Sequence, residues 1–165
     1  LNWQEQSAMQ LNSLLKALAQ EANSDQPEAQ WLPRRAQIDE WLDVGDVRCA
    51  WRALSLLRDH SDPLLSRAGK TLSEGCPLTA HLVWEQLQRA RHLSLAQVFE
   101  MEYTLSLNCC RHPEFAEGVR ARLIDKDQAP RWHWPDINTL PETVVQAHFD
   151  KAWEGRNPLA DLSDY

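Results

Sequence analysis

The sequence predicts an all-α fold. Apolar residues recur at the three- and four-residue spacing of a helix face in one segment after another, and residues that favour helix starts precede several of these segments. No segment alternates apolar and polar residues over the length of a strand. With 165 residues, the chain fits one domain and is long enough to bury a core. We therefore expect a single multi-helix domain over residues 1–165.

The first predicted helix covers residues 4–22, because four leucines at helical spacing form one apolar face. The polar stretch of residues 23–37 contains two prolines and predicts a connection. A shorter helical pattern at residues 38–42 follows and should end by Gly45. The four leucines of the first helix are Leu11, Leu14, Leu15 and Leu18.

Aspartates mark the starts of the next two predicted helices. Asp46 predicts an N-cap, because its carboxylate can accept a hydrogen bond from a free backbone N–H group of the first helical turn. Asp62 is followed by Pro63, which suits the first helical position. This second helix should stop at Gly75. The apolar face of the helix after Asp46 consists of Val47, Ala50, Trp51, Leu54 and Leu57.

Three further helices are predicted between the middle of the chain and its last third. Pro77 starts the first of them, and Ser94 with Gln97 has the form of a capping box that opens the second, which should run to about Cys109. The third helix starts at Pro113. The apolar face after Pro77 consists of Leu78, Leu82, Val83 and Leu87. The helix after Pro113 is expected to bury Phe115, Val119 and Leu123.

The end of the chain predicts little regular structure. One last short helix is expected at residues 142–149, and the polar tail at residues 151–165 is expected to be frayed. Because the chain begins with Leu1 rather than methionine, we expect its start to be a boundary or a cleavage point.

Charge and hydropathy exclude two classes of partner. The net charge of -7 argues against nucleic acid, because proteins that bind phosphate backbones carry a concentrated basic surface. No apolar run approaches the roughly 20 residues that a membrane span needs, and no signal-peptide pattern opens the chain. We therefore expect neither a nucleic acid nor a membrane as partner.

The four cysteines predict reduced thiols. They contain no CxxC pair, and the neighbours Cys109 and Cys110 could bond to each other only with strain. Reduced thiols favour a cytoplasmic location. His112 follows these two cysteines closely, but structural zinc needs four ligands at defined spacing, and no second pair is present. No metal site is expected.

Two segments have an unusual order of residues. Residues 93–106 read Leu-Ser-Leu-Ala-Gln-Val-Phe-Glu-Met-Glu-Tyr-Thr-Leu-Ser, and residues 115–132 read Phe-Ala-Glu-Gly-Val-Arg-Ala-Arg-Leu-Ile-Asp-Lys-Asp-Gln-Ala-Pro-Arg-Trp. Both resemble the 3-hydroxyisobutyryl-CoA hydrolases, a branch of the enoyl-CoA hydratase/isomerase (crotonase) superfamily. A weaker match lies at residues 76–79, Cys-Pro-Leu-Thr, where the family usually has Ser-Pro-Thr-Ser. Residues 68–150 thus resemble family helices, whereas residues 1–67 match only loosely, as a variable helical part would.

The resemblance implies an enzyme that hydrolyses a short β-hydroxyacyl-CoA thioester in valine breakdown. In this superfamily two backbone N–H groups form an oxyanion hole, and in the hydrolase branch a carboxylate assists the attack by water. These elements belong to an α/β core with glycine-rich turns, and the five glycines here form no such loop. The family's Pro-Glu-Thr motif is spelled only by residues 141–143, at a helix start. We therefore expect no catalytic residue in this chain and no metal or redox cofactor.

The resemblance also implies a partner. We expect the chain to be the C-terminal helical domain that packs on the N-terminal crotonase core of the same protein, with an acyl-CoA as substrate of the whole enzyme. The isolated chain should be inactive. Two alternatives remain open: the C-terminal part of an enoyl-CoA hydratase or isomerase, and a free-standing helical interaction module. An exposed apolar face would indicate that the chain packs on another domain. A surface without such a face would favour the interaction module. A homo-oligomer is compatible with the sequence.

Lys126 and Arg131 are the candidate coenzyme A contacts. In crotonase relatives, a lysine that follows the corresponding C-terminal helix can contact the phosphate or adenine end of coenzyme A, and Lys126 has that position in the motif. Arg131 is a second cation just beyond it. The alternative for both is an ordinary solvated surface charge, which is the more common role of an exposed cation and the one that we favour.

Three more expectations concern packing. Glu102 falls on an apolar helix face and is expected to pair with Arg120 or Arg122. Gly118 lies inside a predicted helix, where glycine costs about 1 kcal/mol relative to alanine, so another helix or the core should approach it closely. Two aromatic residues after that helix are expected to be packing anchors: Trp132 and Trp134.

Overall fold

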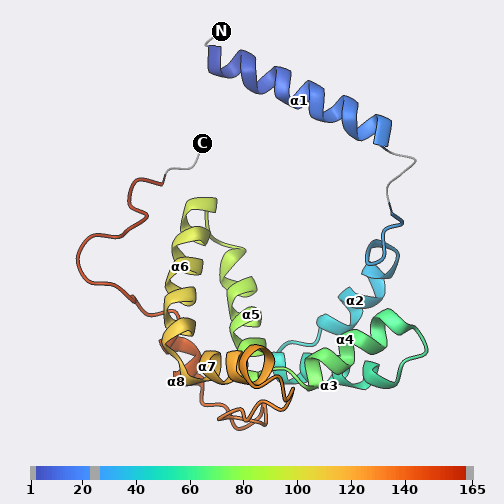
Figure 1. Ribbon diagram of the computed structural model, residues 1–165, viewed down its shortest axis with the longest axis vertical. Helices are drawn as coiled ribbons and strands as arrows, with labels where there is room; N and C mark the ends of the chain where they lie inside the picture. The colour runs from blue at the N-terminus through green and yellow to red at the C-terminus, as the bar shows by residue number, and fades with distance from the viewer. Residues whose placement is uncertain (1–2, 23–26, 163–165) are drawn as a thin grey trace. The chain divides into compact units, whose positions relative to one another are not determined.

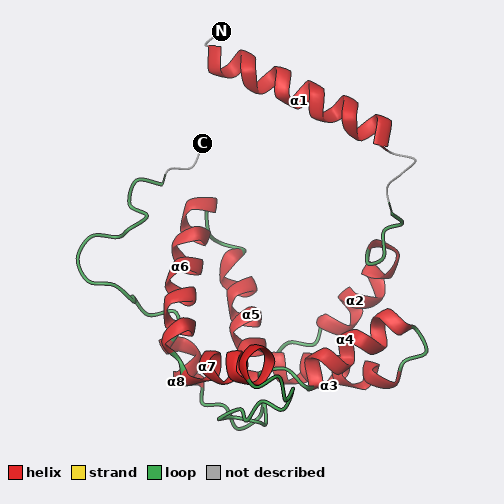
Figure 2. Cartoon of the chain, viewed as in Figure 1, coloured by secondary structure: helices red, strands yellow, loops and turns green. Residues whose placement is uncertain are grey.

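The computed structural model describes residues 3–22 and 27–162. Over these residues every regular element is helical (Figure 2), so the predicted all-α fold is confirmed. The chain forms two compact units, Leu1–Asp39 and Glu40–Tyr165. The predicted division at residue 67, between a variable part and family-like helices, stays a prediction. Among the described helices, none combines the length and the apolar character that a membrane span requires.

The first unit contains the predicted N-terminal helix. Helix α1 spans Trp3–Glu21, and within this unit its four leucines stay more than half exposed. The predicted connection is shorter than expected: a 3₁₀ turn, η2, covers Leu32–Arg34, and α2 already spans Arg35–Leu42. Pro33 lies in the first turn of η2, where its missing N–H costs nothing, so the chain continues directly into a helix. Residues 23–26 of the predicted connection lie outside the described residues.

Side-chain caps start the first helices of the second unit. Helix α3 spans Val47–Ser55, and Asp46 Oδ1 accepts a hydrogen bond from the Cys49 N–H at 2.7 Å. A 3₁₀ turn, η3, covers Leu56–Asp59. Helix α4 spans Pro63–Ser73, and Asp62 Oδ1 accepts from the Leu64 N–H at 2.8 Å. Both predicted caps are confirmed, because an N-cap depends only on residues within one helical turn.

Helix α4 packs against η3 through a glycine that the sequence pattern did not single out. A Cβ atom at Gly69 would lie 2.3 Å from the backbone nitrogen of Arg58 and 2.6 Å from the carbonyl carbon of Leu57. Gly69 is buried, and the Ser66 hydroxyl donates a hydrogen bond to the Arg58 carbonyl at 2.7 Å beside it. Only glycine therefore permits this approach of two backbones.

Helices α5, Pro77–Ala90, and α6, Leu95–Arg111, run side by side as a hairpin in the second unit (Figure 1). The predicted capping box is confirmed, since Ser94 Oγ accepts from the Gln97 N–H at 3.3 Å and Gln97 Oε1 accepts from the Ser94 N–H at 2.8 Å. The predicted ion pair of Glu102 is wrong. Glu102 Oε1 accepts from the Gln86 side chain of α5 at 3.0 Å instead, because the hairpin brings that amide within hydrogen-bond distance.

The core of the second unit lies between this hairpin and the short helix α8, Glu142–Ala147. Helix α8 confirms the helix predicted at residues 142–149. Asn108 of α6 donates to the carbonyl oxygens of His148 and Asp150 at 3.0 and 2.9 Å, which fixes the chain where α8 ends. The buried residues of this core cluster are Leu78, Leu82, Leu105, Leu140 and Val145.

Two residues at the start of the predicted frayed tail pack against α6, whereas the fraying of the rest stays a prediction. Ala152 is buried and its carbonyl accepts from the Arg111 guanidinium at 2.7 Å. The Trp153 ring lies against Tyr103 of α6 at a centroid distance of 5.7 Å. These contacts hold a segment that has no helix hydrogen bonds. A prediction from local polarity alone cannot detect such contacts. Residues 163–165 of the tail lie outside the described residues.

Candidate functional site

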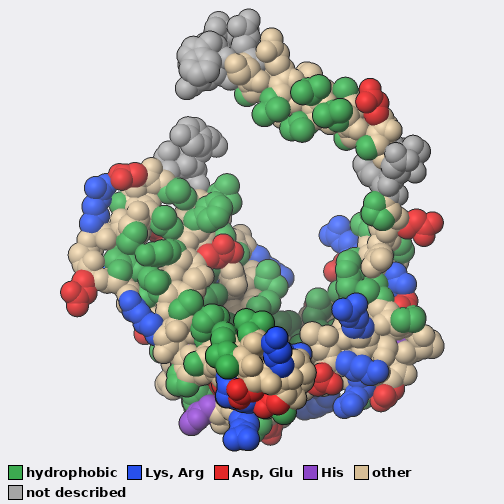
Figure 3. Space-filling view, in the orientation of Figure 1, with side chains coloured by type: hydrophobic (Ala, Val, Ile, Leu, Met, Phe, Trp, Pro, Cys, Tyr) green, Lys and Arg blue, Asp and Glu red, His purple; other side chains and the backbone are tan. Residues whose placement is uncertain are grey.

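A cleft of about 400 Å³ opens between α5, α6 and the helix that follows them. That helix, α7, spans Pro113–Val119 and continues into a single π turn, η4, at Arg120–Ile124. Hydrophobic side chains gather over α6 and α7 on the face seen in Figure 3. The apolar residues that line the cleft are Leu78, Leu82, Phe115, Val119, Leu123 and Trp132.

The predicted burial of the α7 face is wrong for two of its three residues. Phe115 and Leu123 are 52% and 67% exposed, and Val119 is half-buried. Within the described part of the second unit, no element packs over their outer side. The helical spacing correctly placed these side chains on one face, but spacing carries no information about what covers that face.

The polar residues at the cleft are paired mostly with backbone. Glu114 is buried, and its Oε1 accepts from the backbone N–H groups of His133 and Trp134 at 2.9 and 3.4 Å. His112 caps α7 by accepting from the Glu114 N–H at its Nδ1. Its ring lies 4.9 Å from that of the buried His148. These contacts hold the loop of residues 132–134 against the start of α7.

Burial shifts the pKa values of three titratable groups at the cleft, each toward its uncharged form. Desolvation lowers the pKa of His112, and the neighbouring His148 lowers it further. Desolvation raises the pKa values of the Cys76 and Cys109 thiols. A thiol with a raised pKa is a poor nucleophile at neutral pH. In the described ranges, no three His, Cys, Asp or Glu side chains come together as a metal site would require. The walls of the cleft are mainly apolar.

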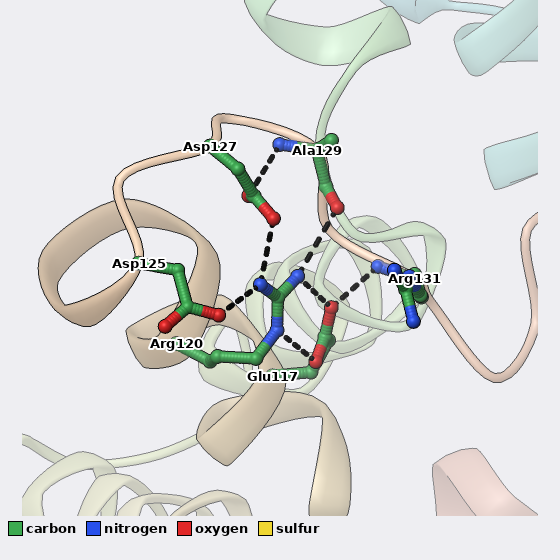
Figure 4. A network of polar contacts seen from close by, with 6 residues as sticks. All are labelled: Glu117, Arg120, Asp125, Asp127, Ala129 and Arg131. Carbon is green, nitrogen blue, oxygen red and sulfur yellow. Dashed lines mark hydrogen bonds and ion pairs between the residues drawn. The ribbon is translucent and has the colours of Figure 1, made fainter.

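The Ile-Asp-Lys-Asp signature forms an ion-pair network around one arginine (Figure 4). The Arg120 guanidinium donates to both carboxylate oxygens of Glu117, at 2.9 and 2.8 Å, one turn earlier in the helix. It also donates to Asp125 at 2.6 Å and to Asp127 at 2.7 Å. The Arg131 N–H closes the network by donating to Glu117 Oε1 at 2.6 Å. One guanidinium thus holds both the end of the helix and the following loop.

The π turn is what brings these groups together. The Asp125 N–H donates to the Arg120 carbonyl, five residues back, at 2.8 Å. The last turn of the helix therefore contains one residue more than an α-helical turn. The chain then reverses through two residues with positive φ, Lys126 at 56° and Gln128 at 57°. The network was not predicted from the sequence, although Glu117 and Arg120 have the three-residue spacing of a helical ion pair.

Lys126 and Arg131 both lie on the surface of this loop. Lys126 is exposed between the two aspartates that bind Arg120, and Arg131 is exposed with its backbone N–H held by Glu117. Both cations thus stand on a loop of fixed shape. Their assignment as coenzyme A contacts stays a prediction.

The predicted close approach at Gly118 is made by a side chain rather than by a helix. A Cβ atom there would lie 3.4 Å from Cη2 of Trp132, which is an ordinary contact distance. Trp132 is half-buried and packs on the glycine. Trp134 stacks on His112 at a centroid distance of 5.7 Å and packs on the core. Both tryptophans are packing anchors, as predicted.

Glu117 is expected to stay ionised in strong acid. Its hydrogen bonds from the Arg120 side chain and the Arg131 N–H lower its pKa from the usual 4.5 to about 2. Because the folded pKa is depressed, the stability that Glu117 contributes is complete above about pH 4.5 and is lost as the pH falls toward 2. The carboxyl carbon of Glu117 should therefore titrate by NMR with a midpoint near 2. A midpoint near 4.5 would contradict the network.

Comparison with known proteins assigns most of the chain to one family. Residues 1–149 match the family described as Enoyl-CoA hydratase/isomerase. The mitochondrial 3-hydroxyisobutyryl-CoA hydrolase of Dictyostelium discoideum is 41% identical over 48% of this chain and 21% of its own length. The protein of that name from Danio rerio is 33% identical over 68% of this chain and 28% of its own length.

A solved structure shares the fold. The crystal structure of an enoyl-CoA hydratase from Rhodobacter sphaeroides 2.4.1 superimposes on 85% of this chain and 43% of its own, with a TM-score of 0.64 and 24% sequence identity. The chain thus spans less than half of that protein and between about a fifth and three tenths of the two curated relatives. Since the family match covers residues 1–149, this chain belongs to the enoyl-CoA hydratase/isomerase family.

Proposed function

We propose that this chain is the C-terminal helical part of an acyl-CoA thioester hydrolase that resembles 3-hydroxyisobutyryl-CoA hydrolase. In this proposal it packs on the catalytic core of the same protein and contributes no residue to bond breaking. The observation that carries the proposal is the uncovered apolar face of α5, α6, α7 and η4.

The uncovered face is large for a free-standing domain. Seven large apolar side chains on these four elements are between 47% and 70% exposed. Monomeric proteins rarely expose large apolar patches, and apolar side chains that gather on one face, as in Figure 3, often mark a contact with another chain or domain. The seven residues are Val83, Leu87, Leu95, Phe99, Phe115, Leu123 and Ile124. This supports the docking part over the free-standing interaction module, whose surface should be sealed.

The relatives support the choice of enzyme. The two hydrolases match this chain over only 21% and 28% of their own lengths, so most of each protein lies outside the matched segment. An oxyanion hole of two backbone N–H groups and a catalytic carboxylate would belong to that larger part. The substrate of the whole protein would then be a short β-hydroxyacyl-CoA, cleaved to the free acid and coenzyme A.

The second candidate is an enoyl-CoA hydratase or isomerase. The structural match to an enoyl-CoA hydratase, with its TM-score of 0.64, favours it, but at 24% identity that match concerns the fold alone. The hydrolases are the better match in sequence, at 41% and 33% identity.

The names of these two relatives place them in mitochondria. For this chain we retain the cytoplasmic location as a prediction, with the mitochondrion as alternative.

The chemistry is tested with the longer protein encoded by the gene of this chain. Incubated with 3-hydroxyisobutyryl-CoA, it should release free coenzyme A, which a thiol reagent detects, together with 3-hydroxyisobutyrate. A hydratase would instead interconvert the hydroxyacyl and the unsaturated thioester without releasing coenzyme A. Product analysis by mass spectrometry separates these outcomes. Loss of water without thioester cleavage would favour the second candidate.

Substitution of the two loop cations tests their contact with coenzyme A. In the longer protein, Lys126→Ala and Arg131→Ala are expected to raise KM for the coenzyme A thioester several-fold and to leave kcat nearly unchanged. A contact with the nucleotide end adds equally to the binding of substrate and transition state. The matched control is the pantetheine thioester, which lacks the nucleotide and should show an unchanged KM. Equal KM values for both substrates in variants and wild type would leave both residues as solvated surface charges.

A further inference from the structure

One histidine joins α6 to α7. Helix α6 ends at Arg111 and α7 begins at Pro113, so His112 is the residue between the two helices. Pro113 has no N–H group, which makes the Glu114 N–H the first donor of α7. The His112 ring accepts from this N–H at its Nδ1, at 3.4 Å. A nitrogen that accepts carries no proton, so the proton of the neutral ring is on Nε2.

The ring of His148 lies beside His112 and is fixed in the opposite tautomer. The two ring centroids are 4.9 Å apart, and His148 is buried at the end of α8. Its Nδ1 lies 2.7 Å from the Val144 carbonyl, which can only accept, so Nδ1 carries the proton of the neutral ring. Its Nε2 is enclosed and has no hydrogen-bond partner within the described part of the chain. A proton added there would meet no acceptor, which costs free energy in a buried place.

The surroundings of His112 disfavour a charged ring. Burial lowers the pKa of His112 below the usual 6.5. His148 on α8 lowers this pKa further, Glu114 on α7 raises it, and His133 on the following loop lowers it. The Glu114 carboxylate is itself bound by two backbone N–H groups, at 2.9 and 3.4 Å, and its attraction does not reverse the shift. The other titratable residues that line the cleft are Cys76, Cys109 and Arg122.

We propose that His112 is a pH-sensitive cap, which holds the corner between α6 and α7 while its ring is neutral and releases it when the ring takes up a proton. A protonated imidazole has N–H groups at both nitrogens, so Nδ1 can no longer accept from the Glu114 N–H. Two donors then face each other at the start of α7, and a positive ring lies beside His148. The Trp134 ring, which stacks on His112 at a centroid distance of 5.7 Å, attracts a cation, but it does not replace the lost acceptor. The inference concerns contacts within the second unit and does not depend on the proposed function.

The comparison of the wild type with His112→Asn tests the cap. Asparagine is among the best N-cap residues, and its side-chain oxygen can accept the Glu114 N–H without taking up a proton. The backbone of His112, at φ -83° and ψ 140°, already has the extended conformation of an N-cap. Unfolding by urea is followed by tryptophan fluorescence in the purified 165-residue chain. Between about pH 7.5 and pH 5, the unfolding equilibrium constant of the wild type relative to His112→Asn should rise at least about fivefold, because the unfolded chain binds a proton at this ring more readily than the folded chain.

The sign follows from the lowered pKa. The contribution of His112 is complete above its usual pKa of 6.5 and is lost as the pH falls below that value. His112→Ala has no cap at any pH, so it should be less stable than His112→Asn at both pH values. His92→Asn is the matched control, because His92 is exposed and lies between α5 and α6. This control should keep the pH dependence of the wild type.

NMR titration of the His112 ring gives a second, independent readout. Its midpoint should lie below 6.5 in the folded chain. A midpoint at or above 6.5 would overturn the inference. Parallel pH profiles of the wild type and His112→Asn would also overturn it, and so would equal stabilities of the asparagine and alanine variants at neutral pH. None of these results bears on the proposed function, which is tested by hydrolysis in the longer protein.

Discussion

Gly69→Ala is expected to destabilise the second unit by about 3 kcal/mol, at the upper end of overpacking in a core. The new methyl group would lie 2.3 Å from the Arg58 nitrogen and 2.6 Å from the Leu57 carbonyl carbon. Both are backbone atoms of η3, so no side-chain rotation relieves the clash, and α4 must move away from η3. The gain in helix propensity from alanine, about 1 kcal/mol, is too small to offset this. Urea unfolding followed by tryptophan fluorescence measures the loss.

Gly118→Ala is the matched control for Gly69→Ala. Both glycines lie in helices, but a methyl group at Gly118 would meet only Trp132 Cη2, at the ordinary contact distance of 3.4 Å. This variant should keep the stability of the wild type or exceed it by up to about 1 kcal/mol, through helix propensity. Equal stability of the two alanine variants would contradict the close packing of α4 on η3.

Arg120→Leu is expected to release the loop of residues 125–131. The substitution leaves the carboxylates of Glu117, Asp125 and Asp127 close together with no guanidinium between them, and like charges then repel. The amides of Ala129 and Arg131 should exchange with solvent at least about tenfold faster, because the loop opens locally. Arg120→Lys should give an intermediate rate, since an ammonium group cannot bond a carboxylate in the two-pronged geometry of arginine.

Arg156→Leu provides the control for charge removal as such. Arg156 pairs only with Asp161 among the described ion pairs, at 2.5 Å, and both side chains are mostly exposed. Exposed pairs of this kind contribute little to stability. The urea midpoint should therefore stay unchanged in Arg156→Leu and fall in Arg120→Leu. Unchanged amide exchange in Arg120→Leu would show that the loop does not depend on the network.

The helix starts could be predicted because caps are local. Asp46, Asp62 and Ser94 each bind backbone N–H groups within the next three residues, so residue type and spacing contain the information that the structure requires. The start of helix α2 was predicted less accurately. Its start depends on the 3₁₀ turn at Pro33, and a proline alone signals both the end of one element and the start of another.

Partners distant in the sequence could not be predicted in this way. Glu102 was expected to bind an arginine of the next helix, but it binds Gln86 because α5 and α6 pack as a hairpin. Gly69 gave no signal, since its contact with Arg58 exists only after α4 folds back on η3. The Arg120 network combines a local pair with Asp127, which only the π turn brings within reach. Periodicity gave the face of α7 correctly, but it could not show that this face stays uncovered.

The central claim is that this chain is the helical part of an enzyme whose catalytic groups lie elsewhere. Its most direct test is the turnover of 3-hydroxyisobutyryl-CoA by the purified 165-residue chain, measured as the release of free coenzyme A beside a buffer blank. We expect no release above the blank, because losing even one donor of an oxyanion hole costs about 10²–10³ in rate and the sequence predicts no such hole in this chain. Release of coenzyme A by the purified chain, in proportion to its concentration, would contradict the claim.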